Sequence, residues 1–385
     1  MERYTWIATA AFGLEGVVAK ELGRMELPAK AENGGAVFEG TLEDAFRANL
    51  WLRTADRILM QIAVFEARSF DALFEQTKAL PWERWIRLHS RFPVTGNCAR
   101  SQLMSVRDCQ AIIKKAIVER MRERTHIAWL PEDQEVVQIS FQIHQNRVRL
   151  TLDASGEALN RRGYRTWNGA APMRETLAAA LVTLSPFRPS LPLVDPMCGT
   201  GTLLIEAAMI SSRKAPGLSR AFAMEQWKDM PSSFQDIRAQ ARAQFDPSRI
   251  AEIAGSDIDP EAIELAKRHV RAAGLEGFIH LEVKDAAQCD PAQTQGVFLT
   301  NPPYGERLGD QKSSEPLYRT LGTLSRRHPA WSFSLITSHP RFEHLFGRRA
   351  TKKRRFYNGR LECEFMIFAP LQRPLQDTLD ALNGA

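Results

Sequence analysis

The sequence predicts an α/β protein with a small α+β part at its N-terminus and a doubly wound, Rossmann-like domain after it. Two stretches predict the second domain. Leu191 to Val194 reads as a short apolar strand, and a glycine turn then leads into a helix that begins near Thr202. Thr300 to Gly305, TNPPYG, follows another apolar run further along the chain. A strand, a glycine turn and a helix form the ligand-binding unit of doubly wound sheets.

The glycine turn favours a cationic ligand over a phosphate. Phosphate loops end in Gly-Lys-Ser/Thr and dinucleotide loops carry G-x-G-x-x-G, whereas this turn has no Lys and an acid at the strand end. S-adenosylmethionine has the required character, because its ammonium suits a carboxylate and its own carboxylate suits the N–H groups of a helix start. A tight structural turn remains the alternative. The expected cofactor contacts here are Asp195, Pro196, Cys198, Gly199, Gly201 and Thr202.

Two later strands end in acids at the distances that a doubly wound sheet requires. Ile253 to Asp259 reads as a strand followed by a helix from Pro260 to Ala273, and Leu281 to Asp285 reads as the next strand. Acids at such strand ends meet the ribose of a bound nucleoside. We therefore expect Asp257 to bind the ribose and Ile258 to lie against the adenine. Asp285 and Ala286 are expected near the adenine amino group.

The motif Asn301-Pro302-Pro303-Tyr304 predicts methylation of an exocyclic amine. It follows a fourth strand, Gly296 to Thr300. The Asn301 side-chain oxygen and the Pro302 carbonyl can accept the two amine hydrogens, and Tyr304 can stack on the base. Prolines fix φ and so aim the carbonyl without a metal. A polar turn without chemistry is the alternative interpretation.

Composition predicts a globular protein with a polyanionic partner. The chain has 385 residues, 44% of them hydrophobic, a net charge of +6 and a pI near 9.1. It shows no signal-peptide pattern and no membrane-length apolar run, so we expect a cytoplasmic protein. Its five cysteines and eight histidines form no zinc or disulfide pattern, so no metal is expected. A packed Cys198 is favoured over a catalytic thiol.

The N-terminal part alternates strands and helices in two modules. Tyr4 to Thr9, Ala36 to Glu39 and Ile58 to Phe65 read as strands, and the helical runs between them complete a ferredoxin-like module over residues 1–65. Residues 66–154 form a second α/β module. Its long helix, Val106 to Glu123, carries several Arg and Lys residues, which fit either a solvated face or contacts with phosphates.

Three basic segments are candidates for nucleic-acid contacts. The expected linker, residues 155–171, holds Arg161, Arg162 and Arg165 beside aromatic residues, and these arginines fit either stacked bases and phosphates or a clamp between domains. The run RRATKKRR is the densest positive charge in the chain and favours contacts with phosphates. Its candidate contacts are Arg348, Arg349, Lys352, Lys353, Arg354 and Arg355. Residues 211–247 form an insertion whose role is not readable from its chemistry.

The chain resembles the THUMP-domain class I methyltransferases, and among them the bacterial enzymes that methylate the guanine amino group of 23S ribosomal RNA. These were long filed as putative N6-adenine-specific DNA methylases. The matching motifs are LNRRGYR, APMRETLAAAL, LVDPMCGTGTLLIEAA, APGLSR, GSDIDP, NPPYGERLG and YNGRLEC.

The resemblance implies a THUMP RNA-binding module over residues 66–154 and an S-adenosylmethionine-dependent methyltransferase domain over residues 172–385. It implies that the segment around Glu175 and Thr176 closes over the cofactor and that Arg307 lies beside the target base. The implied partner is structured RNA, 23S rRNA or a large-subunit precursor, with no membrane and no obligate protein partner. Guanine N2 is the expected acceptor, and adenine N6 of RNA or DNA, a tRNA guanine, and a non-catalytic RNA-binding or ribosome-assembly role remain the alternatives.

Overall fold

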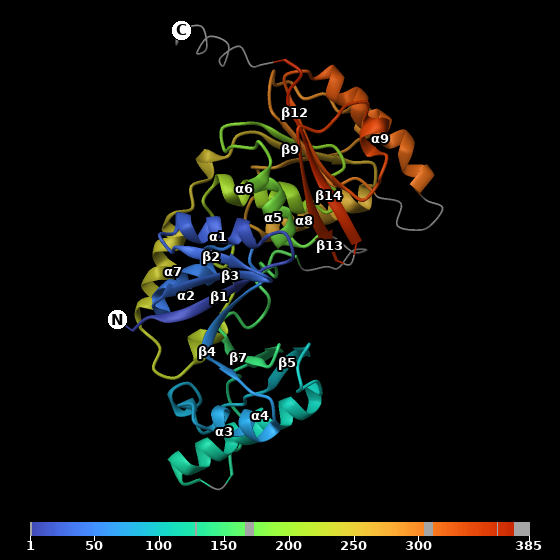
Figure 1. Ribbon diagram of the computed structural model, residues 1–385. Coiled ribbons are helices and arrows are strands. Elements are labelled where there is room, and N and C mark those ends of the chain that lie inside the picture. Colours follow the sequence, from blue (N-terminus) through green and yellow to red (C-terminus); the bar gives the residue numbers. More distant parts are fainter. Residues whose placement is uncertain (1, 128, 166–172, 304–310, 360, 373–385) are drawn as a thin grey trace, which may run out of the picture. The chain divides into compact units, whose positions relative to one another are not determined.

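The computed structural model describes residues 2–127, 129–165, 173–303, 311–359 and 361–372 of the chain. The chain divides into two compact units, and neither is one continuous stretch (Figure 1). Unit 1 comprises Met1–Ala10, Val18–Leu159 and Arg220–Gln240, and unit 2 comprises Ala11–Val17, Asn160–Ser219 and Ala241–Ala385. The division therefore departs from the continuous ranges expected from the sequence at residues 11–17 and 220–240.

Unit 1 is built on one seven-stranded sheet with the order β2-β3-β1-β4-β7-β6-β5. The ferredoxin-like and THUMP halves share this sheet because the long strand β4 pairs with β1 on one side and β7 on the other. All neighbours are antiparallel except β5 and β6. The strands are β1 (Tyr4–Thr9), β2 (Ala29–Glu32), β3 (Gly35–Gly40), β4 (Arg57–Glu66), β5 (Val94–Ala99), β6 (Ile139–His144) and β7 (Arg147–Asp153).

Helices pack against one face of this sheet. Burial alternates along β6, where Ile139, Phe141 and Ile143 are buried and the residues between them are exposed or half-buried, the period expected of a sheet with one covered face. Trp6 and Phe38 lie on the covered side of the ferredoxin-like half. The helices are α1 (Glu15–Arg24), which begins in the segment assigned to unit 2, α2 (Leu42–Trp51), α3 (Phe70–Lys78) and α4 (Val106–Thr125), with a 3-10 turn at Trp82–Arg84.

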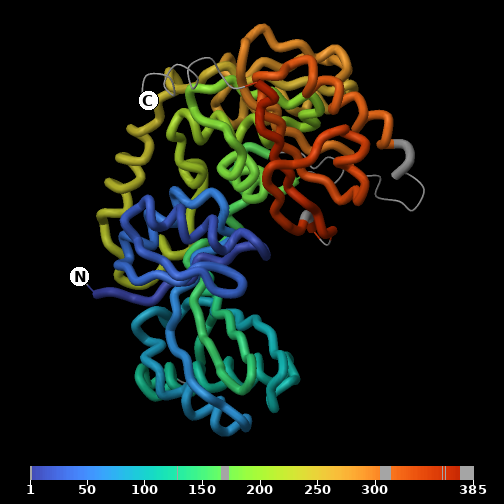
Figure 2. The backbone as a smooth tube through the Cα atoms, turned by 45° about the horizontal axis from the view of Figure 1, so that its top comes forward, coloured from blue at the N-terminus to red at the C-terminus, as the bar shows by residue number. Residues whose placement is uncertain are grey.

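Residues 220–240 of the insertion pack within unit 1. Phe234, in α7 (Ser233–Ala243), stacks on Phe46 of α2 with ring centroids 4.3 Å apart. Phe222 meets the same ring edge-on, and Trp227 meets Trp85. The yellow α7 segment accordingly runs beside the blue N-terminal strands and helices in both views (Figure 1, Figure 2). This part of the insertion, which also holds the 3-10 turn Ala223–Gln226, therefore completes the core of the N-terminal unit.

Unit 2 contains the second seven-stranded sheet, with the order β10-β9-β8-β11-β12-β14-β13. The first five strands in this order are parallel, and β14 and β13 are antiparallel additions at one side. The strands are β8 (Leu193–Asp195), β9 (Ile253–Asp257), β10 (His280–Val283), β11 (Val297–Thr300), β12 (Ser332–Thr337), β13 (Lys352–Asn358) and β14 (Leu361–Phe368). The predicted Rossmann-like fold is confirmed.

The central strands of this sheet are covered on both faces, because every residue of β8, β11 and β12 is buried. On one side Phe298, Phe333 and Phe368 pack with α9 and α10 in an aromatic core. The helices and turns are α5 (Glu175–Leu184), α6 (Thr202–Ser211), α8 (Pro260–Ala272), α9 (Gln311–Arg327) and α10 (Phe342–Phe346), with 3-10 turns at Pro247–Arg249 and Ala286–Gln288. No helix in the described part of the chain is both long and apolar enough to cross a membrane.

Candidate active site

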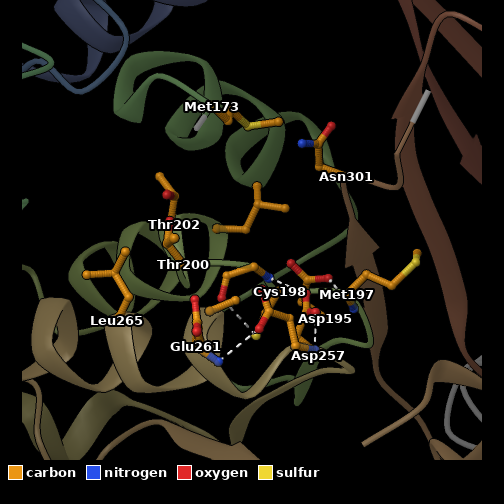
Figure 3. Close-up of a pocket in the computed structure, with 14 residues that line it drawn as sticks. Met173, Asp195, Met197, Cys198, Thr200, Thr202, Asp257, Glu261, Leu265 and Asn301 are labelled. Atoms are coloured by element: carbon orange, nitrogen blue, oxygen red, sulfur yellow. Dashed lines mark hydrogen bonds between the residues drawn. The ribbon is translucent and has the colours of Figure 1, made fainter. Parts of the chain in front are cut away.

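The turn between β8 and α6 is fixed by the end of the neighbouring strand β9. Gly199 and Gly201 adopt φ values of +50° and +79°, the left-handed region that glycine enters without strain. The Cys198 backbone N–H donates to the Ser256 carbonyl at 2.8 Å, and the Gly199 N–H donates to a carboxylate oxygen of Asp257 at 2.8 Å. Figure 3 shows Asp257 beneath this turn. The glycines predicted from the sequence therefore shape a loop that Asp257 holds in place.

Close packing below the turn requires a glycine on β9. A Cβ atom at Gly255 would lie 2.3 Å from Leu204 Cδ1 and 2.9 Å from Cys198 Cβ, which is closer than atoms can pack. Burial raises the pKa of the Cys198 thiol well above its ordinary value, and Asp195 and Asp257 add to that shift. A thiol held in its neutral form is a poor nucleophile. The geometry favours the packing role of Cys198.

A cavity of about 510 Å³ opens over this turn, within the size range of small-ligand sites. Four acids line it: Asp195, Asp257, Asp259 and Glu261. Among the described residues that line it there is no Lys, Arg or His. This surface, which we call the cofactor pocket, suits a ligand that carries positive charge.

Asp195 is the most deeply buried of these acids, with an exposed fraction of 1%. Its carboxylate accepts a hydrogen bond from the Met197 backbone N–H at 3.1 Å. Burial raises the pKa of Asp195 to about 7, and the neighbouring charge of Asp257 acts in the same direction. The carboxylate is thus only partly ionised at neutral pH, and a bound cation would favour its charged form.

Five of the predicted cofactor residues line the pocket, and seven do not. Asp195, Cys198, Gly199, Thr202 and Asp257 line it. Pro196 and Gly201 lie in the same turn without lining the cavity, and Gly201 is the N-cap of α6. Ile258 is 72% exposed, and Asp285 is exposed as the N-cap of a 3-10 turn whose first residue is the buried Ala286. Thr176 and Glu175 are buried at the start of α5.

Ile258, Asp285 and Ala286 are nevertheless close to the same edge of the sheet. β9 and β10 are parallel, and Val283 is the register partner of Asp257. The carboxyl ends of both strands therefore point the same way, as expected for a nucleoside lying across them. Residues that the sequence interpretation missed line the pocket as well: Met173, Met197, Thr200, Leu203, Asp259, Glu261, Ala262 and Leu265. The acid-rich helix start, Asp259-Pro260-Glu261, was the available signal for two of them.

Two linker arginines predicted to contact RNA are instead engaged inside unit 2. Arg162 is 3% exposed, and its Nε lies 3.4 Å from the carboxylate of Glu206, which is fully buried. Arg165 pairs with Glu175 at 3.3 Å and donates to the Thr202 hydroxyl at 2.8 Å. Removing either arginine from its partner would leave a buried charge unpaired, so neither is available to phosphates in this fold.

The same contacts correct the expected position of Glu175. Its carboxylate is held by Arg165 and by the Asn160 amide at 3.3 Å, and burial raises its pKa. Arg165 in turn reaches Thr202, a residue of the cofactor pocket. Glu175 is therefore linked to Thr202 through Arg165 and is not among the described residues that line the pocket. Arg161, the third linker arginine, is exposed.

The proposed amine-binding motif begins at the rim of the cofactor pocket. Asn301 follows β11 and lines the pocket together with Asp195 and Met173 (Figure 3). Pro302 is buried and Pro303 is exposed. The hydroxyl of Tyr318, a buried residue of α9, donates to the Pro303 carbonyl at 2.7 Å and anchors this turn. Tyr304 and Arg307 lie outside the described residues.

The second half of the predicted basic run, from Lys352 onward, lies in β13, and the charges of the run divide into two groups. The first group is engaged within the protein. Arg348 donates to the Ser325 hydroxyl and the Ala369 carbonyl. Lys353 pairs with Glu343 at 2.5 Å, and Arg355 pairs with Glu362 at 3.1 Å. Burial and the nearby Arg326 lower the pKa of Arg348. By contrast, Arg349, Lys352 and Arg354 are exposed and make no ion pair within the described residues. The geometry favours this second group as contacts for an anionic partner.

The described residues fit the expected cofactor. S-adenosylmethionine carries a sulfonium and an ammonium, which match four acids without a lining cation, and a carboxylate, which matches the N–H groups at the start of α6. The fold and this site define a class I methyltransferase with an N-terminal ferredoxin-like and THUMP part.

Comparison with known proteins identifies the family. Residues 162–367 match the model described as "RMKL-like, methyltransferase domain", residues 5–59 match the RlmL ferredoxin-like domain, and residues 67–153 match the THUMP domain. The chain belongs to the RMKL-like methyltransferase family, whose members depend on S-adenosylmethionine.

Relatives extend over nearly the whole chain. It is 41% identical over 380 residues to "Putative RNA methyltransferase YpsC" of Bacillus subtilis, covering 97% of this chain and 98% of that protein. It is 36% identical to "Ribosomal RNA large subunit methyltransferase K/L" of Syntrophotalea carbinolica, over 94% of this chain, and spans about half the length of that protein.

Solved structures show the same fold. A predicted N6-adenine-specific DNA methylase from Listeria monocytogenes superposes with a TM-score of 0.92 at 43% identity, covering 97% of both chains. SMU.472, a putative methyltransferase complexed with SAH, superposes with a TM-score of 0.93 at 38% identity, covering 97% of this chain and 100% of that one.

Proposed function

We propose that the protein transfers the methyl group of S-adenosylmethionine to the exocyclic N2 amine of a guanine in 23S ribosomal RNA. The observation that carries the proposal is the position of Asn301 on the wall of the acidic cofactor pocket. The names of the relatives, an RNA methyltransferase and a large-subunit rRNA methyltransferase, support RNA as the acceptor. The solved relative bound to SAH supports the assignment of the cofactor.

Each group around the pocket has a distinct role in this proposal. When bound, S-adenosylmethionine supplies an electrophilic methyl group. Asp195 holds its ammonium and Asp257 its ribose hydroxyls, since a carboxylate oxygen that accepts one backbone N–H can accept a further hydrogen bond. Cys198, Gly199 and Thr202 complete the wall of the pocket, and Asp285 and Ile258 serve the adenine side.

Asn301 and Pro302 act on the acceptor amine. The Asn301 side-chain oxygen and the Pro302 carbonyl accept its two hydrogens, which directs the nitrogen lone pair toward the methyl group and opposes its delocalisation into the ring. Tyr318 keeps the turn in place through the Pro303 carbonyl. By resemblance to the family, Tyr304 stacks on the flipped base and Arg307 lies beside it.

Exposed positive charges and the THUMP half bind the RNA in this proposal. Arg349, Lys352 and Arg354 are exposed on or beside β13, a strand of the same sheet as β11, and they supply phosphate contacts without base preference. Arg161 is a further candidate on the exposed part of the linker.

The decisive experiment identifies the methylated nucleoside. Purified protein and labelled S-adenosylmethionine are incubated with 23S rRNA from a strain that lacks the gene, and the digested nucleosides are separated by mass spectrometry. N2-methylguanosine is expected. Label in N6-methyladenosine would instead establish the second candidate, adenine methylation, which the name of the Listeria relative favours and which the same Asn-Pro-Pro motif can serve.

Asn301→Ala separates catalysis from binding. Loss of one aimed acceptor should reduce methyl transfer by about 100-fold or more, by analogy with the removal of one donor from an oxyanion hole. Binding of S-adenosylhomocysteine, measured by calorimetry, should change less than about threefold. The Asn301 side chain is proposed to bind the amine of the target base, and that base is absent when only this ligand is bound. Full activity of Asn301→Ala would refute the role of the motif, and a wild-type protein that transfers no methyl group would support the non-catalytic RNA-binding role.

A further inference from the structure

Unit 1 contains a second hollow, distinct from the cofactor pocket, on the face of its sheet opposite to the helices. Its volume is about 310 Å³, at the lower end of the range for small-ligand sites. β1 and β3 of the ferredoxin-like half and β5, β6 and β7 of the THUMP half all line it. Neither half contains the whole of this site, which we call the sheet hollow.

Strand register arranges its lining in two rows of different chemistry. Val37, Ile7 and Leu59 are register partners across β3, β1 and β4, so their side chains share one face and form an apolar row. Asn97, Gln142 and Arg149 are partners across β5, β6 and β7 and form a polar row. Ser140 and Thr151, also partners, add two hydroxyls.

The hollow carries almost no net charge. Glu32 and Arg149 are the only charged residues in its described lining, and their side chains lie 3.7 Å apart. A free phosphate or a carboxylate would meet no unopposed cation here. An uncharged, flat ligand with hydrogen-bonding edges fits better, because the apolar row can contact its face while two amides bind its edge.

Positive charge begins in the next row of the sheet. Arg147 lies two residues before Arg149 on β7, and its register partner on β6 is His144. Both are exposed, as is Arg100 at the end of β5, and none of the three makes an ion pair within the described residues. Glu66, the partner of Arg147 on β4, pairs with Arg68. A phosphate chain attached to a base in the hollow would meet this row.

We infer that the sheet hollow binds the base of an unpaired nucleotide of the RNA substrate, with Asn97 and Gln142 on the edge of the base and Arg147 on its phosphate. This inference rests on the proposed RNA substrate. Amide side chains bind base edges through paired hydrogen bonds, and single-stranded bases are the parts of RNA whose edges proteins can reach. The ferredoxin-like half thus contributes the surface under the base, and the THUMP half contributes the groups that bind its edge.

Binding of short RNAs to the full chain tests the inference. Fluorescein-labelled hexauridylate, hexacytidylate and hexaadenylate are compared with an RNA duplex by fluorescence anisotropy at fixed salt. The double variant Asn97→Ala/Gln142→Ala should weaken at least one hexamer about tenfold or more. Its affinity for the duplex should change less than about twofold. Gln134→Ala, which removes an exposed amide outside the hollow, is the matched control and should leave all affinities unchanged.

The phosphate contact predicts a different pattern. Arg147→Ala should weaken all three hexamers to a similar extent and lower the slope of log affinity against log salt by about one. A hexamer containing 4-thiouridine should cross-link to peptides covering residues 95–99 and 140–151. Cross-links confined to residues 349–357, or a double variant that binds every hexamer like the wild type, would overturn the inference.

Parallel assays separate this inference from the proposed function. Methyl transfer to 23S rRNA and binding of S-adenosylhomocysteine are measured with the same preparations. If the wild type methylates rRNA but binds no hexamer, or binds the hexamers as the double variant does, the hollow is not a base site and the proposed function stands. If the double variant loses hexamer binding while the wild type methylates no RNA, the base site stands and the proposed function fails.

Discussion

The two seven-stranded sheets of this protein expose different parts of themselves. In unit 1, burial alternates along β6, so one face of the sheet is exposed at this strand. In unit 2, every residue of β8, β11 and β12 is buried, so the open part is the edge at which parallel strands end. An edge of converging loops suits a compact cofactor, and an open face suits a polymer that crosses several strands. The pairing of strands therefore decides which kind of ligand each unit can take.

The largest expected effect tests which unit contains residues 220–240 in its core. Phe234→Ala removes a buried ring, 4% exposed, that stacks on Phe46 of unit 1. Truncation of a buried Phe costs about 3 to 5 kcal/mol. Hydrogen exchange should show the loss of protection in β1, β3 and α2. An equal loss confined to β8 and β11 would place the segment in the other sheet's core, contrary to the contacts described. Gln235→Ala, on the same helix but exposed, is the control.

The next effect tests how the edge of the parallel sheet holds its loop. Asp257→Ala removes a carboxylate that accepts the backbone N–H groups of Gly199 and Asp259. The variant also loses the proposed hydrogen bonds from the ribose hydroxyls of the ligand to Asp257. Because a hydrogen bond to a charged group contributes about 1.5 to 3 kcal/mol, affinity for S-adenosylhomocysteine should fall about 10- to 150-fold. Calorimetry measures this. RNA hexamer binding, assigned to the other sheet, should be unchanged, and a parallel loss of both would argue against separate sites.

A smaller effect follows from the buried acid at the edge. Because the pKa of Asp195 is about 7 and a cation requires the ionised form, affinity for S-adenosylhomocysteine should fall as the pH falls below 7, by up to about tenfold per pH unit. The affinity should level off between pH 7 and 8. Calorimetric titrations from pH 5.5 to 8 measure the profile.

Asp195→Asn is the control for this profile and should bind weakly with a flat pH dependence. Folding raises the pKa of the buried Asp195 carboxyl, so the charged form of this group lowers the free energy of unfolding. This loss of stability is absent below about pH 4, grows as the pH rises and is complete above about pH 7. The variant should therefore melt at a higher temperature than the wild type at pH 8 and show little gain at pH 4. A wild-type profile that is already flat would contradict a cation-binding role for Asp195.

The smallest effect distinguishes two groups of charges on β13. Lys352→Ala and Arg354→Ala remove exposed charges without described ion-pair partners, and each should weaken RNA binding a few-fold and lower the salt slope by about one. Lys353→Ala and Arg355→Ala are matched controls, because their charges are already paired with Glu343 and Glu362. Fluorescence anisotropy over a salt series measures both groups, and equal effects in all four variants would contradict the division.

Much of the parallel sheet was predictable because its signals are local. Pro260 after Asp259 marks a helix start, Gly199 and Gly201 mark a turn, and apolar runs mark buried strands. These features identified the acidic edge and the place of Asn301 on it. The fates of Arg162 and Arg165 were not predictable, since an arginine beside aromatic residues looks the same whether its partner is a phosphate or Glu206 on a later helix.

The sheet of unit 1 shows what could not be predicted from local sequence patterns. Its strands were largely predictable, and Gln145 and Asn146 form the expected hairpin turn with φ values of +52° and +62°. The sharing of one sheet by two modules depends on β4 pairing on both sides, which no local pattern encodes. The role of Phe222, Phe234 and Trp227 depends likewise on aromatic partners that are distant in sequence.

The passage of residues 220–240 through the N-terminal core bears on how such enzymes can be divided. A fragment that starts after the linker would carry a loop whose aromatic rings have lost their binding surface, and a fragment that stops before the linker would keep an unfilled groove over Phe46. When the two fragments are expressed together, they should associate through this loop, as the fragments of a split protein do. Genetic exchange of the N-terminal part between relatives would succeed only if the loop were exchanged with it.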